Sequence, residues 1–202
     1  IQADTINLPG SKITHYVLTA GATDDTGDLD TGGASAGTLI IQHSGSFIST
    51  IDGNDIDRVL EIGTGGGAVL DGITITNGTS TASAGGIQVG GNGAILSVFN
   101  SSITNNVGAD TGGIVVLAGG LLSLNDSRVT GNSATNGVSG VGAGGIRYFS
   151  TIGSTIIDTT ISGNTGNGGG GVGFVAGTLS VLNSTISGNT ANDGGGIRVG
   201  GD

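Results

Sequence analysis

The sequence is informative first through what it lacks. Its 202 residues include no cysteine, methionine or tryptophan, a single proline and only six aromatic residues. A chain without cysteine fits an exported protein built without disulfides, although cytosolic proteins can also lack cysteine. Five basic residues face fifteen carboxylates, which gives a formal net charge of −10. This balance argues against nucleic acid as a partner, because binding to nucleic acid comes largely from Lys and Arg that neutralise phosphates.

Long apolar runs are missing as well. No stretch approaches the roughly 20 apolar residues that a membrane-spanning helix needs, so we expect no membrane span in this chain. The start at Ile1 shows no basic segment followed by an apolar one, so we expect any export signal to have been removed or not included.

The 45 glycines follow no triplet period and come with almost no proline, which excludes collagen. The aliphatic residues that recur throughout the sequence predict an ordered chain.

Internal repeats dominate what is present, and they decide the fold. A Gly-Gly pair followed by an apolar residue recurs, and that apolar residue advances in steps of 27, 32, 26 and 25 residues. The five apolar positions are Ile87, Ile114, Ile146, Val172 and Ile197. An Asn-rich turn precedes most of the pairs, as in residues 183–189, Asn-Ser-Thr-Ile-Ser-Gly-Asn. The long step contains an insertion at residues 133–143, which we expect to form an exposed loop at one corner.

Within each unit, apolar and polar residues alternate, as at Leu179 and Val181 or at Ile197 and Val199. This is the period of a β-strand, and the glycine content opposes helices by nearly 1 kcal/mol per residue relative to alanine. Three short strands per unit, separated by Gly and Asn corners, predict an all-β parallel β-helix whose coils build their core by stacking. We expect about six coils over residues 38–202. An N-terminal cap with the first strands, one of them at residues 14–19, is expected over residues 1–37.

Two parts of the sequence resemble known bacterial proteins. The Gly-Gly-Ile and Asn-turn repeats resemble those of polymorphic outer membrane proteins and of large surface proteins with right-handed parallel β-helices. The opening resembles the start of exported β-helix proteins with a CSLREA domain, although the motif that names that family is absent. The segments that carry this second resemblance are 3–9 (Ala-Asp-Thr-Ile-Asn-Leu-Pro), 16–19 (Tyr-Val-Leu-Thr), 27–30 (Gly-Asp-Leu-Asp), 51–54 (Ile-Asp-Gly-Asn) and 57–59 (Asp-Arg-Val). The resemblance implies a right-handed β-helix, export and an extracellular or cell-surface setting. It is compatible with a structural or adhesive module, with surface glycans as one class of partner, and it implies no reaction.

Asparagines at the corners are the most regular polar feature. Asn and Asp tolerate a left-handed backbone and bond their own backbone at turns, so we predict structural ladders rather than a ligand site. One column comprises Asn106, Asn132, Asn164 and Asn189, and a second comprises Asn100, Asp126, Asp158 and Asn183.

Hydroxyl residues flank the apolar residue of the second strand in each unit. We expect them to point outward and to form a solvated face stabilised by cross-strand pairs. Ice binding by a flat Thr-x-Thr array is the alternative, although Arg128 interrupts the array. The hydroxyl residues are Thr74, Thr76, Ser102, Thr104, Thr130, Thr160, Ser162, Thr185 and Ser187.

Another column, Phe99, Ile157 and Leu182, lies where strict alternation places side chains on the outside. Contiguous exposed apolar surface often marks an interface, so an interface is one interpretation. The other is that these side chains tuck into the corners of the coil, because Asp71 and Asn125 break the column.

Carboxylates are sparse in the body of the predicted helix. A carbohydrate-active lyase or hydrolase on this fold needs converging carboxylates, or calcium with a basic residue. The five carboxylates between residues 63 and 201 fall mostly at corners, so we predict no enzymatic activity. They are Asp71, Asp110, Asp126, Asp158 and Asp193.

The densest acidic group is Asp24, Asp25, Asp28 and Asp30. Carboxylate oxygens at this spacing are suitable ligands for Ca²⁺, although the group lacks the closing glutamate of an EF-hand. The alternatives are a calcium site and a solvated acidic loop.

The sequence stops directly after a predicted third strand, at Val199 to Asp202, with no covering segment. Solenoids normally carry terminal caps, because an uncovered coil offers unpaired strand edges to another chain. We therefore expect either that the native protein continues beyond Asp202 or that this end meets the N-terminal end of another copy. Contacts of the second kind form an open filament unless the rotation between copies closes a ring.

Overall fold

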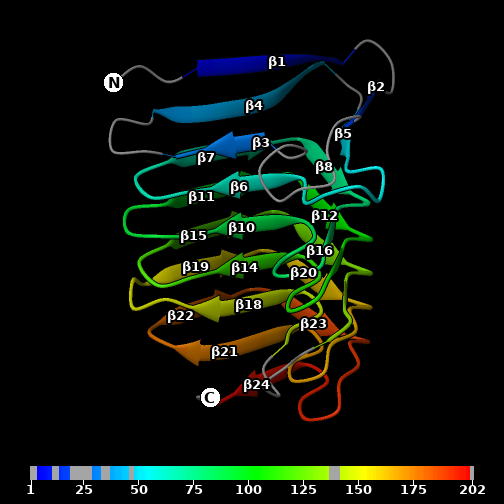
Figure 1. Cartoon of the computed structure of the whole chain (residues 1–202), viewed down its shortest axis with the longest axis vertical. Coiled ribbons are helices and arrows are strands. Elements are labelled where there is room, and N and C mark those ends of the chain that lie inside the picture. Colours follow the sequence, from blue (N-terminus) through cyan, green and yellow to red (C-terminus); the bar gives the residue numbers. More distant parts are fainter. Residues whose placement is uncertain are drawn as a thin grey trace.

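The computed structural model describes residues 4–10, 14–18, 29–32, 37–45, 48–136 and 142–200. All regular structure in these residues is β, and the strands stack as a column of coils (Figure 1). Three sheets each contain seven parallel strands, and a small fourth sheet contains three. The chain visits the three large sheets in turn, so every strand pairs with its equivalents in the neighbouring coils.

We name the large sheets A, B and C in the order in which the chain reaches them. Sheet A consists of β1 (Asp4–Gly10), β4 (Thr38–Gly45), β7 (Gly67–Asp71), β11 (Ile95–Phe99), β15 (Leu121–Asn125), β19 (Ser154–Ile157) and β22 (Leu179–Leu182). Sheet B consists of β2 (Thr14–Val17), β5 (Ser49–Asp52), β8 (Ile73–Thr76), β12 (Ser102–Thr104), β16 (Arg128–Thr130), β20 (Thr160–Ser162) and β23 (Thr185–Ser187). Sheet C consists of β3 (Leu29–Thr31), β6 (Leu60–Ile62), β10 (Ile87–Val89), β14 (Ile114–Val116), β18 (Ile146–Phe149), β21 (Val172–Ala176) and β24 (Ile197–Val199). The small sheet consists of β9 (Thr79–Ser80), β13 (Val107–Gly108) and β17 (Ser133–Ala134).

This architecture confirms the predicted all-β parallel β-helix with three main strands per coil. Six coils run from β4 to β24. The N-terminal strands β1, β2 and β3 extend sheets A, B and C by one strand each, because they pair in parallel with β4, β5 and β6. The predicted strand at residues 14–19 corresponds to β2.

The core is a set of apolar columns inside the coil. Along sheet B, for example, Ile75, Ile103, Val129 and Ile161 are in register and are fully buried. The alternation along each strand sends one set of side chains inward, and stacking of the coils then removes that set from water. Near the C-terminal end, the ring of Tyr148 stacks on that of Phe174 with centroids 5.7 Å apart.

In four of the five Gly-Gly pairs, the second glycine lies where the chain passes close to a corner asparagine. A Cβ on Gly145 would lie 2.5 Å from the carbonyl oxygen of Gly171 and 3.1 Å from Nδ2 of Asn164. A Cβ on Gly113 would lie 2.4 Å from the carbonyl oxygen of Gly145 and 3.3 Å from Nδ2 of Asn132. The backbone carbonyl of the next coil therefore excludes a larger residue at these glycines, and the asparagine side chain narrows the same space further.

The insertion at residues 133–143 differs in part from the expected exposed loop. Ser133 and Ala134 form β17, and Ala143 is fully buried and bridges Thr111 in the adjacent coil. Residues 137–141 lie outside the described residues. The expectation is therefore wrong at the two ends of the insertion, which are part of the coil wall.

Candidate functional site

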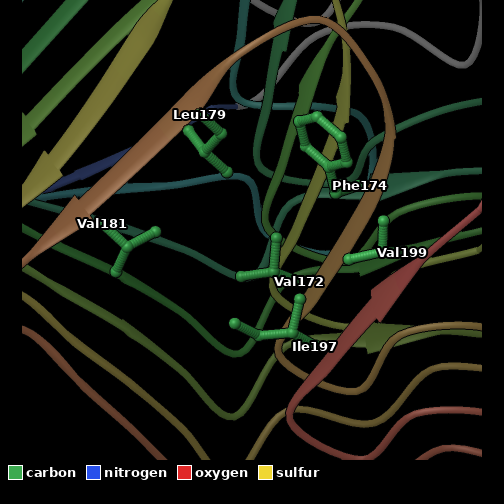
Figure 2. Close-up of a pocket in the computed structure, with 6 residues that line it drawn as sticks. All are labelled: Val172, Phe174, Leu179, Val181, Ile197 and Val199. Atoms are coloured by element: carbon green, nitrogen blue, oxygen red, sulfur yellow. The ribbon is translucent and has the colours of Figure 1, made fainter.

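The C-terminal end of the stack is an open section through the core. Strands β22, β23 and β24 are the last strands of sheets A, B and C, so one edge of each has no partner among the described strands. Figure 2 shows inward side chains from sheets A and C around a hollow of about 260 Å³. The lining is entirely apolar and consists of Val172, Phe174, Leu179, Val181, Ile197 and Val199.

Exposure rises sharply at this last coil. Val181 is 37% exposed and Ile197 is 48% exposed, whereas their partners one coil earlier, Ile156 and Val172, are at most 1% exposed. Val199, at 74%, is the most exposed of the group. These are core residues by sequence and register, and they meet solvent because no further coil covers them in this structure.

The N-terminal end exposes the same columns. Ile6 of β1 stands in the column that ends at Val181, and it is 43% exposed. In sheet B the column that ends at Ile186 begins at Tyr16, which is half-buried. In sheet C, Leu29 begins the column that ends at Ile197. The two ends are thus opposite faces of one continuous set of apolar columns.

The four corner asparagines form a hydrogen-bonded ladder inside the coil. Nδ2 of Asn106 donates to Oδ1 of Asn132 at 3.0 Å, Asn132 donates to Asn164 at 3.0 Å, and Asn164 donates to Asn189 at 2.9 Å. The backbone N–H of each donor asparagine also donates to that same Oδ1. Asn106, Asn132 and Asn164 are at most 1% exposed, and Asn189 is half-buried at the open end. The amides are occupied by one another and by carbonyl groups, which is the arrangement of a structural ladder.

The second predicted column lies at the corner between sheets A and B. Asn100, Asp126, Asp158 and Asn183 all have left-handed backbone, with φ between 47° and 51°. Asn100 also donates to Asp71 at 2.9 Å, and Asn183 donates to Asp158, so that neighbouring coils are linked at this corner.

A ladder of hydroxyl groups was not anticipated from the sequence. Ser101, Ser127, Thr159 and Ser184 each follow one of these left-handed residues, and each hydroxyl donates to the carbonyl two residues earlier. Each hydroxyl oxygen also accepts from the backbone N–H of its equivalent in the preceding coil. The recurrence of Ser or Thr directly after the corner Asn or Asp was the signal that could have revealed it.

The outward hydroxyl residues of sheet B stand in two columns in register. Thr76, Thr104, Thr130, Ser162 and Ser187 form one column, which Asp52 and, before it, Val17 continue toward the N-terminal end. The other contains Thr50, Thr74, Ser102, Thr160 and Thr185, and Arg128 interrupts it. Oγ1 of Thr130 donates to Oγ1 of Thr104 at 3.3 Å, so the hydroxyls bond partly along the stack.

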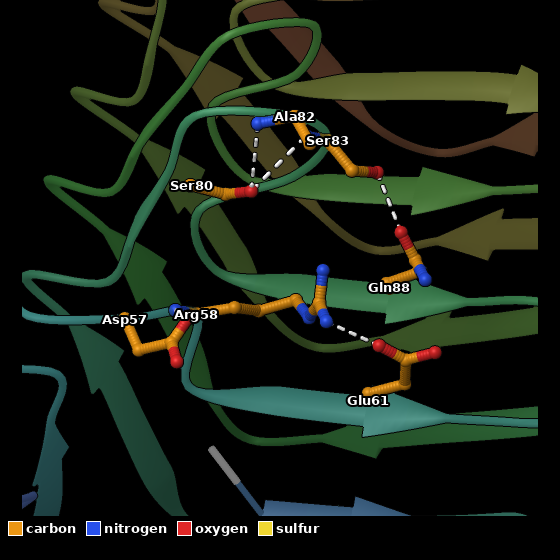
Figure 3. Close-up of polar contacts among 7 residues, drawn as sticks. All are labelled: Asp57, Arg58, Glu61, Ser80, Ala82, Ser83 and Gln88. Carbon is orange, nitrogen blue, oxygen red and sulfur yellow. Dashed lines mark hydrogen bonds and ion pairs between the residues drawn. The ribbon is translucent and has the colours of Figure 1, made fainter. Parts of the chain in front are cut away.

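The outward face of sheet C is polar and cross-linked to the adjacent corner. Figure 3 shows the almost fully buried Arg58 extending to Glu61. In the following coil, the hydroxyl of Ser83 bonds to the side chain of Gln88. Farther along, Nη1 of Arg147 lies 2.7 Å from Asp110. These contacts hold the corner segments against the sheet. Val115 is in register with Gln88 and Arg147 on this outward side, and it is fully buried.

The predicted interface residues Phe99, Ile157 and Leu182 lie in one outward column of sheet A, with Asn125 between the first two. Leu182 is 55% exposed, whereas Phe99 and Ile157 are half-buried. Their role as an interface stays a prediction.

Of the candidate calcium ligands, Asp24, Asp25 and Asp28 lie outside the described residues. Asp30 lies in β3 and is exposed, in register with Glu61. No group of three or more His, Cys, Asp or Glu side chains suited to a metal occurs among the residues that the structure describes. Two of the carboxylates considered for catalysis, Asp110 and Asp193, face Arg147 and Arg198.

In the described ranges, no helix has the length and apolar character needed to span a membrane. Comparisons of the chain with protein-family models, with curated proteins and with solved structures give no match.

Proposed function

We propose that this chain is a structural β-helix module of an extracellular or cell-surface protein and that its copies stack head to tail. The observation that carries the proposal is the open C-terminal coil, whose core residues Val181, Ile197 and Val199 are 37%, 48% and 74% exposed. Such an end offers apolar surface and three rows of unpaired backbone groups to another β-helical coil.

The N-terminal end of a second copy suits this surface. A copy translated along the stack would set Ile6 beneath Val181, Tyr16 beneath Ile186 and Leu29 beneath Ile197, and would continue each apolar column. It would also present parallel strands to all three open edges, which repeats the pairing that already joins every coil to the next. An interface of this heterologous kind does not close on itself, so it generates a filament.

The charge distribution disfavours one of the other end-on arrangements. Ten of the fifteen carboxylates and only two of the five basic residues lie in residues 1–71. Contact between two N-terminal ends would therefore bring two acidic regions together, whereas head-to-tail contact sets the acidic end against a nearly neutral one. We expect the association to strengthen with salt, which screens the remaining repulsion.

The expected affinity is modest. Full burial of an aliphatic side chain contributes about 1.5–3 kcal/mol, and these side chains are already partly covered. Association costs about 4–15 kcal/mol in lost translational and rotational freedom. Pairing on three strand edges therefore has to contribute to binding, and stacking is expected to depend on protein concentration.

Sedimentation of the purified chain tests the proposal. The average mass should rise above 19.2 kDa with concentration, and Val181→Asp should abolish the rise because it places a charge in the apolar contact. Ser180→Asp is the matched control, since Ser180 is on the same strand and is exposed on its outer face. A wild-type chain that stays monomeric at every concentration would contradict stacking and would leave further coils or domains of a longer chain as the partner.

A further inference from the structure

Seven positions in the chain join Asn or Asp directly to a glycine. Such pairs are the ones most prone to spontaneous deamidation and isomerisation. The backbone nitrogen of the glycine attacks Cγ of the preceding side chain and forms a succinimide ring, while Asn releases ammonia or Asp releases water. Water then opens the ring at either carbonyl, and the product is aspartate or isoaspartate. The pairs begin at Asp52, Asp71, Asn77, Asn92, Asn136, Asn167 and Asp193.

In all six pairs whose glycine the structure describes, the N–H of that glycine donates a hydrogen bond to an adjacent coil. Oδ1 of Asn106 is the acceptor for Gly78, at 2.9 Å. Backbone carbonyl oxygens are the acceptors for the other five glycines, at 2.8–3.1 Å, and these glycines are Gly53, Gly72, Gly93, Gly168 and Gly194. The seventh pair, residues 136–137, extends outside the described residues.

These hydrogen bonds act on the nitrogen that has to react. For the ring to form, the glycine N–H must lose its proton to a base from the solvent, and the nitrogen must approach Cγ. A hydrogen bond to the adjacent coil opposes both steps, so the reaction requires a local opening between the two coils. When opening and closing are fast, the rate falls in proportion to the population of the open form.

Asn77 is held at every group that takes part in the reaction. Its Nδ2 donates to Oδ1 of Asp52 at 3.0 Å, and its Oδ1 accepts from Oγ1 of Thr76 at 3.3 Å. Gly78 is buried, and Asn106, which accepts from its N–H, is fully buried. A base from the solvent therefore reaches this N–H only when the corner opens.

We infer that the stacking of coils within one chain protects its Asn-Gly and Asp-Gly pairs from succinimide formation, and that Oδ1 of Asn106 protects Asn77. Asn92 is the least protected of the described Asn-Gly pairs, because Asn92 and Gly93 are both exposed. Among these pairs, deamidation of the folded chain therefore begins at Asn92. The inference concerns contacts within one chain and does not depend on head-to-tail association of copies.

Peptide mass spectrometry of the chain, incubated at mildly alkaline pH with and without guanidinium chloride, tests the protection. Deamidation at Asn77 and Asn167 should be at least about 100-fold slower in the folded than in the unfolded chain, and at Asn92 about tenfold slower. Equal rates at Asn77 in the folded and unfolded chain would overturn the inference.

Asn106→Ala tests the assignment to one residue, because it removes the acceptor of the Gly78 N–H. Asn164→Ala is the matched control. Asn164 is fully buried in the same ladder, but its Oδ1 accepts from the N–H and Nδ2 of Asn132, so its loss leaves Gly78 bonded. We expect deamidation at Asn77 to be at least about tenfold faster in Asn106→Ala than in the control. Equal rates in the two variants would overturn the role of Asn106, and if Asn106→Ala does not fold, the comparison of folded and unfolded wild-type chain still decides the inference.

Discussion

Asn132 lies in the middle of the asparagine ladder, and its replacement by alanine tests how much the ladder stabilises the fold. Oδ1 of Asn132 accepts from the backbone N–H and from Nδ2 of Asn106, both at 3.0 Å. Its Nδ2 donates to the carbonyl of Ile103 and to Oδ1 of Asn164, again at 3.0 Å. The side chain is 1% exposed, so water does not readily replace these partners.

The cost can be estimated from the buried groups that lose a hydrogen bond. After Asn132→Ala, Nδ2 of Asn106 keeps the carbonyl of Thr104 at 3.1 Å, and Oδ1 of Asn164 keeps the backbone N–H of residue 132. The N–H of Asn106 loses its acceptor, and the carbonyl of Ile103 loses a donor. At about 1–3 kcal/mol for each of these two buried groups, the free energy of unfolding should fall by about 2–6 kcal/mol. For a chain of this size, the loss corresponds to about 10 °C in Tm.

Urea and thermal unfolding followed by circular dichroism measure this loss. Asn136→Ala is the matched control, because Asn136 is exposed and the hydrogen bond that it donates to the carbonyl of Ala109 comes from its backbone N–H, which alanine retains. The control should change stability by less than about 0.5 kcal/mol. Equal losses in the two variants would refute the view that the ladder stabilises the coil.

Three further substitutions test other parts of the fold by the same unfolding measurements. Ile161→Asp should prevent folding or cost several kcal/mol, because Ile161 is fully buried and a buried carboxylate without a partner is costly. Ser162→Asp, on the outer face of the same strand, should be tolerated. Similar losses of stability in the two variants would contradict the inward assignment of Ile161. Gly145→Ala should cost about 1–3 kcal/mol, because its Cβ would lie 2.5 Å from a carbonyl oxygen of the next coil, and an unchanged Tm would show that this corner can relax. Arg147→Met should cost about 1.5–3 kcal/mol, because its ion pair with Asp110 is mostly buried, with 14% and 24% of the side chains accessible, and the carboxylate would lose its charged partner. An unchanged Tm would show that this ion pair does not hold the corner.

The sequence was sufficient to predict the coil and its apolar columns, because it combines the two-residue alternation of a strand with the longer period of the Gly-Gly pairs. Alternation along each strand set the inward direction of Ile103 and Ile161, and the recurrence of the Gly-Gly pairs set the register between coils. The asparagine column at Asn132 followed from the same recurrence.

What the sequence could not provide depends on neighbours in other coils. Ser127 looks like an ordinary turn residue, and its role appears only when the N–H of Ser101, one coil away, is found to donate to its hydroxyl at 3.2 Å. Alternation directs Val115 away from the core, yet its side chain is fully buried. Alternation gives the direction of a side chain relative to its sheet, but not what covers that side of the sheet.

Opposite ends of two copies meet in the proposed stack, and mixing two blocked variants tests this contact most directly. Val181→Asp blocks the C-terminal end, and Ile6→Asp blocks the N-terminal end. Head-to-tail stacking predicts that each variant alone is monomeric and that their mixture contains a dimer of twice 19.2 kDa and no larger species. A mixture that stays monomeric, or Ile6→Asp that forms dimers alone, would contradict the account.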